Sequence, residues 1–67
     1  MRQKLQDARL NAGLSQEQAG ALIGRSPSHY GKIERGQIGL SADAALVLCE
    51  RLQIGLRDLL SQDIVNS

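Results

Sequence analysis

The sequence predicts an all-α protein, a compact five-helix bundle that forms a single domain over residues 1–67. Its length is that of one small domain, its apolar residues (42%) return at helical spacing, and no segment alternates as a β-strand does. A single cysteine, Cys49, excludes an internal disulfide, and one histidine with one cysteine cannot complete a zinc site. We therefore expect no metal or cofactor, and we expect a second subunit to support so small a core.

The first two helices are delimited by a glycine and a serine. The first is predicted over residues 2–12, with Gly13 ending it. Ser15 is a suitable N-cap, and Gln18 three positions later completes a capping box. The second helix then covers residues 16–23.

The third helix follows a tight turn. Gly24 supplies the turn because a glycine adopts positive φ at little cost. Ser26 is the next N-cap, and Pro27 occupies the first helical position, where its missing N–H is not needed. This helix runs to about residue 35 and is expected to bury Tyr30 and Ile33.

The last two helices complete the bundle. Ser41 caps a helix over residues 42–52, and the fifth helix begins near residue 56. The predicted buried face of the fourth helix consists of Ala45, Leu46, Cys49 and Leu52.

Residues 16–35 have the layout of a helix-turn-helix motif. Ala19 and Gly20 are small enough for a close helix crossing, and Gly24 permits the turn. The third helix is then left with an outer face for the DNA major groove, made of Pro27, Ser28, His29, Gly31 and Lys32. An ordinary helical hairpin in a small bundle is the alternative.

The distribution of charge fits this interpretation better than its total. A net charge of +1 identifies no partner. However, Arg25, Lys32 and Arg35 lie in or beside the third helix together with His29. Arg25 and His29 are candidates for contacts with the DNA backbone, and the Lys32 ammonium can donate to guanine O6 and N7.

Positive charges near the start of the chain are weaker candidates. Arg2 and Lys4 could also meet the DNA backbone.

The run from residue 14 to residue 60 resembles the Cro and phage-repressor type of helix-turn-helix protein, also called the xenobiotic-response-element family. The resemblance is carried by the segments LSQEQAGALIG, SPSHYGKIERG and LSADAALVLCERLQIGLRDLL. It implies a lambda-repressor-like DNA-binding domain that binds a two-fold operator in double-stranded DNA as a homodimer.

The resemblance also implies roles for matched positions. The positions that face base edges are Pro27, Ser28 and Lys32. The positions that contact the DNA backbone are Gln16, Arg35 and Gly36. Arg9 and Glu34 match a structural ion pair between the first helix and the end of the third.

Two residues depart from the family pattern. Pro27 has no hydrogen-bonding side chain, so it can offer a base only apolar contact. Tyr30 replaces a smaller aliphatic residue, and its ring is expected to pack inward with the hydroxyl at the edge, near a phosphate.

The end of the chain has more apolar residues than a small core can bury. We expect a homodimer interface on the fifth helix and the tail, formed by Leu56, Leu59, Leu60, Ile64 and Val65. A tail folded back on its own core is the alternative.

These features together favour a sequence-specific transcriptional regulator, more specifically a repressor. The alternative is a protein-interaction module, such as an antitoxin that binds a toxin and autoregulates its operon. An enzyme is not expected, because the sequence has no catalytic or phosphate-binding motif. No small-molecule ligand is evident, and the absence of a signal peptide or membrane-spanning run favours a cytoplasmic protein.

Overall fold

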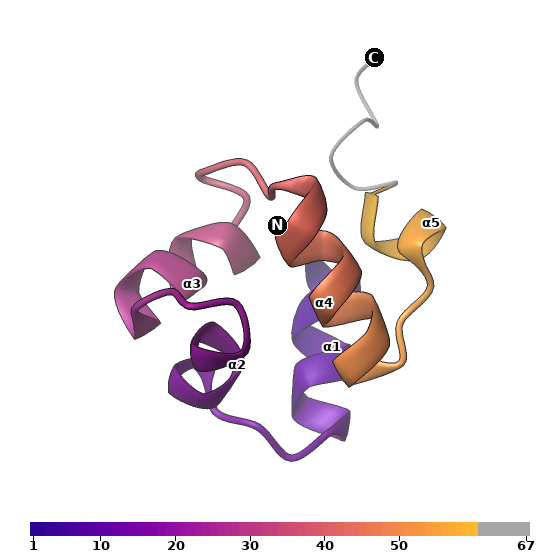
Figure 1. Cartoon of the computed structure of the whole chain (residues 1–67), viewed down its shortest axis with the longest axis horizontal. Coiled ribbons are helices and arrows are strands. Elements are labelled where there is room, and N and C mark those ends of the chain that lie inside the picture. Colours follow the sequence, from indigo (N-terminus) through magenta and orange to yellow (C-terminus); the bar gives the residue numbers. More distant parts are fainter. Residues whose placement is uncertain (61–67) are drawn as a thin grey trace.

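A computed structural model describes residues 1–60 of the chain, and these residues form helices and no strand (Figure 1). The helices are α1 (Gln3–Asn11), α2 (Gln16–Leu22), α3 (Pro27–Glu34), α4 (Ala42–Leu52) and α5 (Leu56–Leu60). The α2–α3 pair lies on one side of α1 and α4, and α5 lies on the other (Figure 1). The predicted all-α class is confirmed, with helix ends within one or two residues of those expected.

Serine caps begin three of the helices, as predicted. The Ser15, Ser26 and Ser41 hydroxyls each accept a hydrogen bond from the backbone N–H three residues later, at 3.0, 3.1 and 3.2 Å. The Ser15 N–H donates in turn to Oε1 of Gln18 at 2.8 Å, which completes the capping box. These caps fix where α2, α3 and α4 start because they satisfy backbone donors that have no partner within the helix.

Every helix contributes to one hydrophobic core. Its buried members are Leu5, Ala19, Tyr30, Ile33, Ala45, Leu48, Leu52 and Leu59. Because the core joins α1 and α4 to the α2–α3 pair, it holds the two motif helices at a fixed angle to the rest of the molecule.

The buried face of α4 differs from the predicted one. Leu46 is 57% exposed, whereas Leu48, which the prediction omitted, is fully buried. Residues 44–49 read AALVLC, so they are apolar on every side of the helix and their spacing does not select a face.

The assignment of Leu59 to a dimer interface was wrong. Leu59 is 0% exposed and belongs to the core of its own chain. A five-residue helix such as α5 needs an anchor to hold it against α1 and α4, and this leucine is buried in the core that those helices share.

Candidate nucleic-acid interface

The turn between α2 and α3 brings the two helices unusually close. A Cβ atom on Gly20 would lie 2.8 Å from the carbonyl oxygen of Arg25 and 3.2 Å from the Cβ of Tyr30. The Arg25 N–H donates to the Gly20 carbonyl at 2.8 Å, and Gly24 adopts a φ of +67°. The absence of a side chain at Gly20 therefore allows the close crossing, as the sequence suggested.

The solvent-facing side of α3 carries the residues predicted to face base edges. Pro27, Ser28 and Lys32 are all exposed, and Pro27 lies in the first turn of the helix behind the Ser26 cap. The arrangement offers one ammonium donor, one hydroxyl and one apolar ring edge along a single helix. These groups can contact base edges in a major groove.

The residues predicted to contact the DNA backbone surround this face. His29 and Arg35 are exposed, and Gln16 is half-buried at the start of α2. Arg25 is exposed at the turn, where its Nη1 donates to the Ile23 carbonyl at 3.3 Å. The Gly36 N–H donates to the Ile33 carbonyl at 3.0 Å, so it can offer a phosphate only a shared donor.

Gly31 does not belong to the exposed face, contrary to the prediction. It is buried beneath two side chains from opposite ends of the motif. A Cβ atom there would lie 3.1 Å from Nη1 of Arg35 and 3.5 Å from Oε1 of Gln16. The helix backbone at Gly31 is thus covered by groups that can themselves bind a phosphate.

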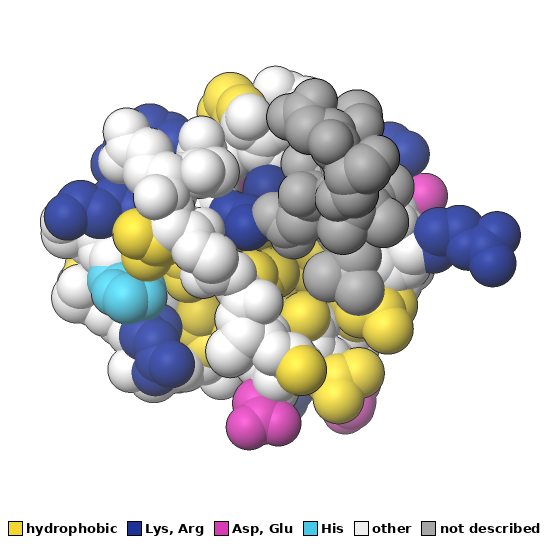
Figure 2. Space-filling view, turned by 90° about the horizontal axis from the view of Figure 1, so that it is seen from above, with side chains coloured by type: hydrophobic (Ala, Val, Ile, Leu, Met, Phe, Trp, Pro, Cys, Tyr) yellow, Lys and Arg dark blue, Asp and Glu magenta, His cyan; other side chains and the backbone are white. Residues whose placement is uncertain are grey.

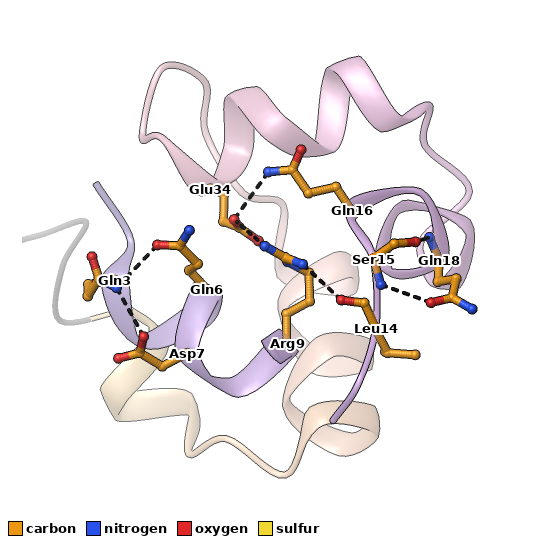
Figure 3. Close-up of polar contacts among 9 residues, drawn as sticks. All are labelled: Gln3, Gln6, Asp7, Arg9, Leu14, Ser15, Gln16, Gln18 and Glu34. Carbon is orange, nitrogen blue, oxygen red and sulfur yellow. Dashed lines mark hydrogen bonds and ion pairs between the residues drawn. The ribbon is translucent and has the colours of Figure 1, made fainter. Parts of the chain in front are cut away.

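A buried polar cluster locks α3 against α1 and α2 (Figure 3). The Arg9 guanidinium donates to both carboxylate oxygens of Glu34, at 2.7 and 3.2 Å, and also to the Leu14 carbonyl at 2.8 Å. Glu34 is only 1% exposed and also accepts a hydrogen bond from Gln16 Nε2 at 3.3 Å. The hydrogen bond with Glu34 raises the pKa of the Arg9 guanidinium.

This cluster sets orientation more than it adds stability. The desolvation cost of two buried charges largely offsets their attraction, so a buried pair contributes little net free energy. Removing one partner is costly, however, because the other charge stays buried and uncompensated. The pair therefore specifies how the end of α3 meets α1.

The position of the Tyr30 hydroxyl corrects another expectation. The whole side chain is buried, and the hydroxyl lies beside the Arg9 and Glu34 side chains, so it cannot reach a phosphate. The ring fills the space between α3 and α2 that Gly20 leaves open. Burial, together with the nearby Glu34 charge, raises the pKa of Tyr30.

Arg2 has a structural role that the sequence analysis did not predict: it binds backbone carbonyls at and after the end of α3. Its N–H donates to the Glu34 carbonyl at 2.8 Å, and its buried guanidinium donates to the carbonyl oxygens of Ile33 and Ile38. A cation at this end of α3 satisfies free carbonyls and favours the helix dipole. No local pattern predicts this contact, because Arg2 and Ile33 are 31 positions apart.

Lys4, in contrast, is paired with a residue of α5. Its ammonium is 3.4 Å from a carboxylate oxygen of Asp58 on α5. Both side chains are more than half exposed, so the pair contributes little stability.

Positive charge gathers on the α3 side of the molecule. Figure 2 shows the cyan histidine beside dark blue Lys and Arg side chains on this side, with the prominent acidic side chains elsewhere. The α3 side therefore offers a polyanion several cations, whereas the dark blue side chains at the opposite edge of Figure 2 lie beside an acidic one.

A separate apolar surface lies on α4, α5 and the loop before α4. Leu46 and Leu56 are 57% and 41% exposed, and with Leu40, Ala42 and Ala45 they line a groove that is mostly apolar. Figure 2 shows exposed hydrophobic side chains on the half of the molecule that holds α4 and α5. Of the other residues predicted for an interface, Ile64, Val65 and the side chain of Leu60 lie outside the described part of the chain.

Within residues 1–60, no helix is long and apolar enough to cross a membrane. No three His, Cys, Asp or Glu side chains in this part of the chain gather closely enough to hold a metal ion.

The sequence matches a known protein family. A family model described as a helix-turn-helix domain matches residues 1–61. The match covers all five helices and confirms the resemblance predicted from the sequence. Searches of curated proteins and of solved structures give no significant match.

Proposed function

Because the chain belongs to the helix-turn-helix domain family, of the type found in xenobiotic-response-element and Cro-like regulators, we propose that it is a transcriptional regulator that reads duplex DNA with α3. The observation that carries this proposal is the exposed side of α3, where Ser28 and Lys32 stand free of the core while Glu34 anchors the end of the same helix. A rigidly held helix with an outward polar face suits direct reading of bases.

Three side chains are proposed to face the bases. Lys32 donates to guanine O6 and N7, and Ser28 donates to or accepts from a neighbouring base. Pro27 packs its ring against a thymine methyl group, because it has no polar group to offer. Lys32 is then the main determinant of sequence preference.

A second group is proposed to hold the phosphates. Gln16 and Arg35 approach from the two ends of the motif, and Arg25 and His29 flank them on the exposed surface. Gly36 contributes its shared N–H. These contacts set the register of α3 without carrying sequence information, and they make binding sensitive to salt.

We further propose that the regulator is a homodimer that represses transcription by occupying a two-fold operator. The exposed leucines Leu46 and Leu56 and the apolar groove between them support a self-association surface. Leu60, Ile64 and Val65 are proposed to extend that surface. Such a dimer would place its two α3 helices about 34 Å apart, one turn of the DNA helix.

Selection from a pool of random duplexes tests this function. The protein is expected to enrich a sequence with two inverted half-sites whose centres are about 10 base pairs apart. The Lys32→Ala variant is expected to enrich the same spacing with a relaxed preference at one position of each half-site. Failure of the parent to retain any duplex at low salt would contradict a DNA-binding function and favour a protein-interaction module.

A further inference from the structure

Gly31 is an unexpected residue for the middle of α3. Glycine in a helix interior costs about 1 kcal/mol relative to alanine, because it loses more backbone freedom. Its backbone φ is not in the positive range that would require glycine. The conformation of α3 therefore does not explain its presence.

Crowding by the fold does not explain Gly31 either. The atoms nearest to a Cβ at this position are the ends of two flexible side chains, Nη1 and Nη2 of Arg35 and Oε1 of Gln16. Gly20 is different, because a Cβ there meets backbone oxygens that cannot move independently. An alanine at position 31 would fit the helix and would press only on the Arg35 guanidinium, since 3.5 Å from Gln16 is an ordinary contact distance.

The two side chains over Gly31 are tied to the buried cluster. Gln16 donates from Nε2 to Glu34 at 3.3 Å, and its Oε1 lies over Gly31. Glu34 is in turn fixed by Arg9 at 2.7 Å. The anchored Gln16 carboxamide and the Arg35 guanidinium therefore both lie over the backbone of Gly31.

We infer that Gly31 is a positioning residue for DNA phosphate binding, because its missing side chain lets Arg35 and Gln16 lie together over α3. This inference rests on the proposed function. A guanidinium held in one place can bind a phosphate through two parallel hydrogen bonds, whereas a displaced one must reorganise first. Gly31 thus costs the fold stability and improves binding of the DNA backbone.

A double-mutant cycle between Gly31 and Arg35 tests the inference. Gly31→Ala is expected to raise the melting temperature by about 4–8 °C, through its helix propensity. In the same variant, affinity for the selected duplex is expected to fall roughly five-fold, which is the size of a direct coupling between neighbours. In an Arg35→Ala background, Gly31→Ala is expected to stabilise the protein as before and to leave affinity unchanged.

The control is Asn11→Ala, a helix-stabilising substitution at the exposed end of α1. It should raise stability without changing affinity. The inference is overturned if Gly31→Ala binds like the parent, if it melts at a lower temperature, or if it weakens binding equally in the Arg35→Ala background. A parent that binds no duplex would overturn the proposed function itself, and this inference with it.

Discussion

At the scale of single residues, the orientation of α3 depends on a few polar side chains beneath it. Arg9 of α1 and Gln16 of α2 both donate hydrogen bonds to the carboxylate of Glu34 in α3. The pairing of Arg9 with Glu34 was suggested by family resemblance, since no local pattern links residues 25 positions apart. The contact of Gln16 with Glu34 was not expected, because the family resemblance implies only a phosphate contact for the Gln16 side chain.

Reversing the charge of Glu34 should disrupt the fold. Glu34→Lys leaves the Arg9 guanidinium buried beside a second cation, and breaking such a pair costs about 3–5 kcal/mol. Unfolding in urea, followed by circular dichroism, should show most of the protein's stability lost. The double replacement Arg9→Met with Glu34→Leu should recover much of it, because apolar groups need no charge partner. An unchanged urea midpoint for Glu34→Lys would refute the structural role of the pair.

The buried Tyr30 hydroxyl predicts a pH effect with a definite sign. Since the pKa of Tyr30 is raised in the folded protein, the folded state keeps its proton after the unfolded state has lost one. The stability that this group contributes is present below the ordinary tyrosine pKa of 10.0 and declines as pH rises above it. Comparing the parent with Tyr30→Phe isolates the effect from the titration of lysines.

The same comparison tests whether the Tyr30 hydroxyl is buried in the folded protein. Equal stability losses of parent and variant between pH 9 and 11, measured by urea unfolding, would show that the hydroxyl is not buried in this way.

At the scale of elements, features set by neighbouring residues could be predicted from the sequence, whereas features set by contacts between helices could not. The starts of α2, α3 and α4 were predictable because a serine cap acts on an N–H only three residues away. The buried face of α4 was not, because its apolar residues surround the helix and only contact with α2 and α5 distinguishes Leu48 from Leu46. Leu59 was misassigned for a different reason: α5 is short, and only its packing against α1 and α4 shows that this leucine anchors it in the core.

The crossing of α2 and α3 should be intolerant of a single methyl group. Gly20→Ala places Cβ against the carbonyl oxygens of Arg25 and Ser26, so the turn must shift. We expect a destabilisation of about 1–3 kcal/mol from overpacking, although alanine favours a helix. Gly31→Ala is the matched comparison, since both replace a buried glycine within a helix. A gain of stability for Gly20→Ala in urea unfolding would mean that the helices do not cross this closely.

At the scale of the whole molecule, DNA binding and self-association are proposed for two separate surfaces. The side of α3 carries positive and polar groups, whereas α4 and α5 present an apolar groove (Figure 2). Their separation suits a dimer in which the apolar surfaces meet and both α3 helices remain available to DNA. The sequence indicated this division, but only the structure moved Leu59 from the apolar surface to the core.

Replacing an exposed leucine in the groove should separate the dimer. Leu46→Glu introduces a charge at the proposed interface, and sedimentation should show a monomer at concentrations where the parent is a dimer. Leu10→Glu is the matched control, because Leu10 is also 57% exposed but lies on α1, outside the groove. A monomeric parent, or the same effect from both variants, would contradict this interface.

In the proposed function, α3 reads base edges while Arg35 holds the DNA backbone. The most direct test of this function is the affinity of the parent, Lys32→Ala and Arg35→Ala for the selected duplex and for random duplexes, each measured over a series of salt concentrations. We predict that Lys32→Ala loses affinity for the selected duplex alone, by about 1–3 kcal/mol, whereas Arg35→Ala weakens binding to both and lowers the salt slope by about one. Equal losses of both variants on both duplexes would contradict sequence reading by α3.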